Sequence, residues 1–298
     1  MIDGFIVNDM PRNGIRVVLS DFVIIRNNQC DHNFERGIFT GFTDHILIEN
    51  NICTNSIDEH GIYFSNSGDF PIIRNNVCHH NRGAGIQINA DLSAGGDGIT
   101  TGAVIEGNIL YENGTGGGAA INLDGAVESL VANNLLYNNH ATGIALFRQD
   151  AAIGARDNKI YNNTVIQAPD ARWCININTG STGATLHNNI LITFHSFRGS
   201  IAVDNSSIQG FSSDYNIVVD RLTSRGDDFS DPFSSWQQDG YGLHSMLADP
   251  MADIFDDSGS LDFHLMLNSS GHKYRQRPDN RGNNQRPRFC FPSTGKWF

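Results

Sequence analysis

The sequence predicts an all-β chain that folds as a parallel β-helix, a solenoid of about eight coils. One position of an imperfect repeat carries isoleucine eight times, at intervals of 23 to 35 residues. This period is typical of repeats that each form one supersecondary unit. The isoleucines are Ile15, Ile38, Ile62, Ile86, Ile121, Ile144, Ile175 and Ile201. Two residues after each comes another apolar residue or threonine, and a mostly different class of residue stands between, so each segment alternates as a half-buried strand does.

A ladder of asparagines runs in step with the isoleucines, 13 to 15 residues after six of them and 22 and 19 residues after Ile86 and Ile144. Its members are Asn28, Asn51, Asn76, Asn108, Asn134, Asn163, Asn189 and Asn216. Asparagine tolerates left-handed backbone geometry, and stacked copies can pair amide to amide. The ladder therefore predicts a corner between short strands, with two or three strands in each coil and the isoleucines facing inward.

Two other repeat folds fit this pattern poorly. Leucine-rich repeats need a recurrent Leu-x-x-Leu-x-Leu frame, which is missing, and no 3.6-residue periodicity runs long enough for helical repeats. The stretch GIYFSNSGDFPIIRNNVCHHNRGAGIQINAD, residues 61–91, resembles the β-helix repeat of the pectate-lyase-like superfamily, and the resemblance covers roughly residues 1–220. With the general preference for right-handed crossovers, this resemblance implies a single-stranded right-handed parallel β-helix.

Composition favours one solenoid over two domains. The chain has 31 glycines, 17% charged residues and a net charge of −12. We expect coils over residues 1–220, and then a side loop, a closing strand and an irregular tail, packed on or beyond the last coil, over 221–298. The negative charge argues against nucleic acid as a partner. A polyuronate would also be repelled unless a metal ion or a local basic patch intervened.

Three cysteines share one repeat position, which later coils fill with leucine or valine. Cys30, Cys53 and Cys78 are therefore expected to be stacked interior thiols rather than metal ligands or a disulfide. The sequence has no signal peptide and no apolar stretch of transmembrane length, and we expect the protein in its full-length form to be secreted or at the cell surface. Residues 2–7 already read as a strand, so the first coil needs a cover, which a second copy of the chain could supply.

The resemblance implies a site on the outer face of one sheet, beside long loops. The insertion at residues 90–102 has a strong composition shift and is the best candidate for such a loop. Polar residues at outward positions and strand ends surround it. The expected catalytic residues are Asp91, Asp124, Asp150 and Arg148. The expected substrate-binding residues are Tyr63, Gln87, Asn89 and Asn122.

Distance is the physical case for the carboxylates. Neighbouring coils lie roughly 4.8 Å apart, which would suit Asp91 and Asp124 to the roughly 5 Å gap of retaining glycosidases, while Asp91 and Asp150 could supply the wider gap of inverting ones. Like charges so close would raise one pKa and create a proton donor. Arg148 could orient a sugar. The structural alternative is that aspartates at strand ends satisfy turn amides.

Three ionisable residues, Asp58, Glu59 and His60, stand in a row just before a predicted strand. They could provide a general base for proton abstraction from a uronic acid, or a pair of ligands for Ca²⁺ as a cofactor. The alternative is a solvated turn. No zinc site is expected at His79 and His80, because the repeat places no second pair of ligands near them.

Two functions remain open. The first is a carbohydrate-active enzyme, a hydrolase, lyase or epimerase acting on a polysaccharide or oligosaccharide. The alternative is a non-catalytic glycan-binding or adhesin-type surface protein. Likeness of fold cannot choose between them.

Overall fold

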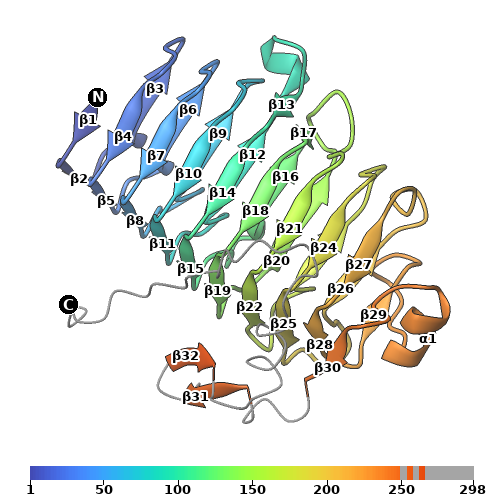
Figure 1. The fold of residues 1–298 in the computed structure, drawn as a ribbon. Coiled ribbons are helices and arrows are strands. Elements are labelled where there is room, and N and C mark those ends of the chain that lie inside the picture. The colour runs from blue at the N-terminus through green and yellow to red at the C-terminus, as the bar shows by residue number, and fades with distance from the viewer. Residues whose placement is uncertain (249–253, 258–261, 266–298) are drawn as a thin grey trace, which may run out of the picture. The chain divides into compact units, whose positions relative to one another are not determined.

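The computed structural model describes residues 1–248, 254–257 and 262–265, and it confirms the right-handed parallel β-helix (Figure 1). Each coil contributes one strand to each of three long parallel sheets, here called sheets A, B and C. Residues Met1–Ala248 form one compact unit, and Asp249–Phe298 form a second. Within the described residues of the second unit, β31 (Phe255–Asp257) pairs antiparallel with β32 (Asp262–Leu265). The expected tail beyond residue 265 lies outside the described residues.

The strands of the three sheets are short, and each pairs with its counterpart one coil away. Sheet A contains β1 (Ile2–Asp3), β4 (Ile24–Arg26), β7 (Leu47–Glu49), β10 (Ile72–Arg74), β14 (Val104–Glu106), β18 (Leu130–Ala132), β21 (Lys159–Tyr161), β24 (Thr185–His187) and β27 (Ser212–Asp214). Sheet B contains β2 (Ile6–Asn8), β5 (Gln29–Asp31), β8 (Ile52–Thr54), β11 (Val77–His79), β15 (Ile109–Tyr111), β19 (Leu135–Tyr137), β22 (Thr164–Gln167), β25 (Ile190–Thr193), β28 (Ile217–Val218) and β30 (Met246–Leu247). Sheet C contains β3 (Asn13–Val18), β6 (Arg36–Gly41), β9 (Ile62–Ser65), β12 (Ile86–Asn89), β16 (Ala119–Asp124), β20 (Thr142–Phe147), β23 (Ile175–Ile177), β26 (Ile201–Val203) and β29 (Leu222–Thr223).

The eight isoleucines lie in register in sheet C and face the core, as predicted. Ile15 in the first coil is 6% exposed, and the other seven are fully buried. Leu222 continues the column opposite Ile201, so sheet C has nine strands where eight isoleucines had suggested about eight coils. Parallel pairing also continues beyond residue 220 in sheet B, where β30 pairs with β28.

The asparagine ladder also forms as predicted. From Asn28 to Asn216, each buried side chain donates from Nδ2 to the Oδ1 of the next coil, over 2.9 to 3.1 Å. The left-handed backbone belongs to the preceding residue, as at Asn27 with φ 55° and Asn133 with φ 57°. One asparagine therefore turns the chain while its neighbour fills the corner. A second amide ladder, Asn81 to Asn113 to Asn139, stands at another corner and was not predicted.

The predicted interior thiols are confirmed. Cys30, Cys53 and Cys78 are unpaired, fully buried and in register on adjacent strands of sheet B. The Cys30 thiol lowers the pKa of Cys53, but the Cys78 thiol and burial together raise it well above its usual range, so Cys53 stays protonated.

The insertion at residues 90–102 contains a 3-10 turn, η1 (Leu92–Ala94), and β13 (Thr100–Thr101), which pairs with β17 (Ala126–Val127). A short helix, α1 (Phe233–Gln238), follows sheet C near the end of the solenoid (Figure 1). None of the helices in the described part of the chain is long and apolar enough to span a membrane.

Candidate functional site

Coil stacking brings three columns of residues together at the start of sheet C. The columns lie three residues before, two residues before and one residue after the inward isoleucine of each coil. The first column is Arg12, Glu35 and Glu59; the second is Asn13, Arg36 and His60; the third is Arg16, Phe39 and Tyr63. Parallel register thus gathers cations, carboxylates and aromatic rings from the first three coils on one outer surface.

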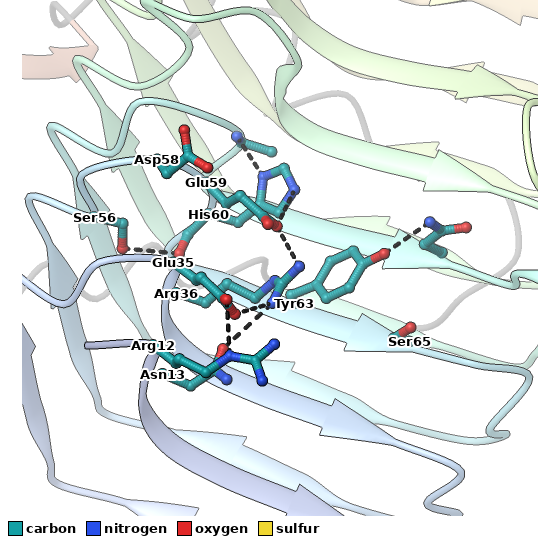
Figure 2. A network of polar contacts seen from close by, with 12 residues as sticks. Arg12, Asn13, Glu35, Arg36, Ser56, Asp58, Glu59, His60, Tyr63 and Ser65 are labelled. Carbon is teal, nitrogen blue, oxygen red and sulfur yellow. Dashed lines mark hydrogen bonds and ion pairs between the residues drawn. The ribbon is translucent and has the colours of Figure 1, made fainter. Parts of the chain in front are cut away.

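Arg36 is the centre of this cluster (Figure 2). Its Nη1 donates to Glu35 Oε2 over 2.9 Å, and its Nη2 bonds Glu59 Oε2. Glu35 also accepts from Arg12 Nε over 2.9 Å. The guanidinium carbon lies 4.6 Å from the centroid of the Tyr63 ring, within the range of cation–π contact. The Arg36 side chain is only 15% exposed, so its charge is held rigidly and is little screened by water.

Glu59 is the carboxylate of the cluster that can change its protonation state most readily. Burial raises its pKa above the usual range, against the attraction of Arg36, and the neighbouring charges of Glu35 and Asp58 also raise it. The side chain remains 31% exposed. A carboxylate that accepts a proton more readily than usual, and that a solute can reach, has the properties of a general base.

His60 stands beside Glu59 as a neutral donor. Its Nδ1 accepts the backbone N–H of Ala84 over 2.8 Å, so the neutral ring carries its proton on Nε2. That Nε2 lies 3.8 Å from Glu59 Oε2. Burial and the charge of Arg36 lower the pKa of His60 to about 3, which keeps the ring uncharged at neutral pH. The outward nitrogen therefore offers an N–H and not a lone pair.

Tyr63 completes the cluster and links it to the insertion loop. Its ring stacks on His60 with centroids 5.2 Å apart, and its hydroxyl oxygen accepts from Asn89 Nδ2 over 2.8 Å (Figure 2). The hydroxyl proton is left for donation to another group. Burial raises the pKa of Tyr63 above its usual range, so the phenol holds its proton and can act as an acid.

Three of the predicted site residues form one chain of contacts. Asn89 Nδ2 donates both to Tyr63 and, over 3.1 Å, to Asp150 Oδ2, whereas its Oδ1 is buried without a partner. Gln87 and Asn122 bond each other instead, with Asn122 Nδ2 donating to Gln87 Oε1 over 2.8 Å. The four predicted substrate-binding residues thus lie on neighbouring strands, but as two separate hydrogen-bonded groups.

Of the remaining predicted residues, Asp124 and Asp91 bond to groups of the loops, whereas the side chain of Arg148 does not. Asp124 is 1% exposed, and its two oxygens accept the backbone N–H groups of Gln149 and Asp150 over 2.9 and 2.8 Å. Burial raises its pKa, with a further contribution from Asp150, against the effect of the amide bonds. Asp91 caps η1 and bonds Ser93. Arg148 is exposed, and its guanidinium has no partner among the described residues. The structure records no contact that joins the Asp91 and Asp124 side chains.

Sequence reasoning identified Asp58, Glu59, His60 and Tyr63 but missed Arg36 and Glu35. A signal was present. Glu35 and Glu59 are both three residues before a column isoleucine, and Arg36 and His60 are both two residues before one. Aligning the coils on the isoleucines would have placed all four side by side.

Residues 2–141, less than half of the chain, match the family model described as "Periplasmic copper-binding protein (NosD)". No curated protein matches. Three solved structures share the architecture. Alginate lyase from Paenibacillus sp. str. FPU-7 is 18% identical, with a TM-score of 0.45, over 61% of this chain and 72% of that one. The AlgE6 mannuronan C-5 epimerase A-module of Azotobacter vinelandii is 17% identical, with a TM-score of 0.47, over 66% and 58%. DFA-IIIase from Arthrobacter chlorophenolicus A6 is 12% identical, with a TM-score of 0.48, over 76% and 53%.

The chain therefore spans little more than half the length of the last two proteins, and likeness at this level describes the coil architecture alone.

The described residues do not fit a metal centre. They contain no group of three or more His, Cys, Asp or Glu side chains arranged to hold a metal ion. Neither the copper named in the family description nor the Ca²⁺ considered from the sequence finds a ligand set among them.

Proposed function

We propose that the protein modifies an acidic polysaccharide, removing the proton next to a carboxylate carbon of a uronic acid, as a lyase or an epimerase does. The supporting observation is the Glu59 carboxylate, with its raised pKa, beside the His60 Nε2–H and the Tyr63 phenol on an outer face of the solenoid. The arginines Arg12, Arg16 and Arg36 outnumber Glu35 and Glu59, the carboxylates paired with them, and so leave the local basic charge that a chain of net charge −12 needs in order to hold a polyanion.

Each side chain has a distinct role in this proposal. Glu59 takes the proton from the sugar carbon. The guanidinium of Arg36 and the Nε2–H of His60 stabilise the negative charge that then develops on the substrate carboxylate. In elimination, Tyr63 gives its proton to the leaving glycosidic oxygen as the carbon–oxygen bond breaks and a carbon–carbon double bond forms. In epimerisation, Tyr63 gives that proton to the opposite face of the same carbon.

Hydrolysis by the aspartates is the second candidate, because burial raises the pKa of Asp124 as a proton donor requires. Its two oxygens, however, already accept backbone N–H groups. The set of Asp91, Asp124, Asp150 and Arg148 stays a prediction, and so does a second copy covering the first coil. The extracellular or periplasmic setting is likewise part of the proposal; it is in keeping with the word periplasmic in the matched family's description.

The test is a screen of acidic and neutral polysaccharides with wild-type protein, Glu59→Gln and Tyr63→Phe. Elimination gives unsaturated products that absorb in the ultraviolet, and epimerisation in D₂O places deuterium on the sugar, which NMR detects. We expect one of these signals from an acidic glycan and a loss of at least about 100-fold in each variant. Glu128→Gln, on an exposed corner away from the cluster, is the matched control.

Three outcomes would decide otherwise. Reducing ends without unsaturated product or deuterium would favour hydrolysis. Binding of glycan without any turnover would favour the non-catalytic alternative. Full activity in Glu59→Gln would refute the assignment of the base.

A further inference from the structure

Arg16 differs from the other arginines near the cluster. Each of the others pairs with a carboxylate: Arg12, Arg26, Arg36, Arg74 and Arg82. Arg16 is exposed on the outer face of β3, and its side chain forms neither a hydrogen bond nor an ion pair with any described residue. Its guanidinium carbon lies 5.5 Å from the centroid of the Phe39 ring. The aromatic contact holds the cation in place while leaving its donors free.

Arg16 stands in the same row as the proposed acid Tyr63. Backbone register pairs Arg16 with Phe39 and Phe39 with Tyr63 on the adjacent strands β3, β6 and β9. Strands are spaced roughly 4.8 Å apart, so the row places the free guanidinium about two spacings from the phenol along the solenoid axis. That separation is on the length scale of a disaccharide.

The charges in and beside the row of Arg16, Phe39 and Tyr63 favour binding of an anion near the first coil. Arg36 is neutralised by Glu35 and Glu59, and Arg12 shares Glu35. Arg16 therefore adds a positive charge that no described carboxylate compensates. His60 is neutral, because its pKa is lowered to about 3. The row is thus a locally basic strip on a chain whose net charge is −12.

We propose that Arg16, held on Phe39, is a subsite for the carboxylate of a second acidic sugar of the same glycan. The polysaccharide then lies across β9, β6 and β3, parallel to the solenoid axis, with its neighbouring acidic residue toward the first coil. This inference rests on the proposed function for the position of the reacting sugar, but the subsite itself acts in binding.

The test is calorimetric titration with an acidic monosaccharide, acidic di-, tri- and tetrasaccharides and a neutral tetrasaccharide. Arg16→Gln should weaken binding of the acidic di-, tri- and tetrasaccharides about tenfold, a loss of about 1.4 kcal/mol, with a much smaller change for the monosaccharide and none for the neutral glycan. On polymer, KM should rise while kcat stays nearly constant. Arg16→Lys should restore part of the affinity. Lys159→Gln removes one exposed cation from β21 of sheet A and should change nothing.

Unchanged affinity in Arg16→Gln at every length, or an equal loss in Lys159→Gln, would overturn the subsite, and so would a failure of the wild-type protein to bind any acidic glycan. The two proposals can fail separately. Length-dependent binding through Arg16 without turnover refutes only the catalytic proposal. Turnover that depends on Glu59 but not on Arg16 refutes only the subsite. A melting curve for each variant checks that it is folded.

Discussion

The inner and outer sides of sheet C follow opposite rules. Inside, one column is isoleucine in eight successive coils, and the corner column is asparagine. Outside, the row one residue later changes at nearly every step, from Arg16 through Phe39 and Tyr63 to Gln87 and Asn122. Inside the solenoid, stacking favours the same residue type in successive coils, because equal side chains fill equal spaces and pair with one another. On the outside, where no such constraint acts, unlike residues become neighbours and chemistry becomes available.

The largest expected effect breaks the inner rule. Ile121→Asn adds a polar group without a partner and removes apolar contacts, so we expect a loss of about 3–5 kcal/mol in unfolding free energy. Ala145→Asn places the same side chain on the outer side of the adjacent strand, and the expected change there is within about 0.5 kcal/mol. Denaturant unfolding measures both variants. An unchanged midpoint for Ile121→Asn would contradict the inward assignment.

The amide ladder should tolerate change almost as poorly. Asn108 accepts from Asn76 and donates to the Ile73 carbonyl and to Asn134. Asn108→Ala leaves buried backbone groups without partners, and we expect a loss of about 2–3 kcal/mol. The exposed Asn205→Ala serves as the control. Equal stability of the two variants would mean that the ladder is dispensable.

A smaller effect is expected where the outer face meets a loop. Asp124→Asn replaces one acceptor oxygen with a donor that faces a backbone N–H, and should cost about 1–2 kcal/mol. Asp150→Asn, at an exposed position, should cost less. Melting and glycan turnover are measured together for both variants. Loss of turnover in Asp124→Asn without loss of stability would support the aspartate site and extend the chemical part of the outer face.

The smallest expected effect is the pH dependence of stability that comes from His60. The pKa of His60 is about 3 in the folded protein against a usual 6.5. The unfolded chain therefore binds a proton first, and the contribution to stability is complete above about pH 6.5 and lost as the pH falls toward 3. Between pH 6.5 and 5.5 the wild type should lose about 1 kcal/mol more than His60→Gln. Parallel pH profiles of unfolding for the two proteins would expose an error in this assignment.

The inner side could be predicted because its constraint repeats. The eight isoleucines mark one repeated position in the coil, the eight asparagines a second and the three cysteines a third. The structure places all of these residues inside. The ninth coil was missed because Leu222 and Met246 do not keep the interval. The second amide ladder was missed because it joins only three asparagines and has the doubled asparagine that marks the first ladder only once, at Asn138–Asn139.

The outer side could be predicted only in part. Tyr63, Asn89 and Asp150 do form one chain of contacts. Arginine occupies its column in one coil alone, at Arg36, and its partners Glu35 and Glu59 come from two coils. Composition and local pattern therefore did not indicate a role for Arg36. Asp124 illustrates the opposite difficulty. An aspartate at a strand end has the same sequence signal whether its oxygens face solvent or backbone N–H groups, and only the path of the loop at 147–151 distinguishes them.

The asparagine ladder also gives the solenoid an electrical direction. At each step from Asn28 to Asn216, the side-chain oxygen points to the earlier coil, and one Nδ2–H donates to the coil that comes later in the chain. The second N–H donates to a backbone carbonyl of the earlier coil, as from Asn108 to Ile73. Aligned amides polarise one another, and their dipoles add as peptide dipoles do in an α-helix. The asparagine corner is therefore a buried row of aligned dipoles, with its negative end at the first coil and its positive end at the last. The two ends of the ladder thus carry partial charges of opposite sign.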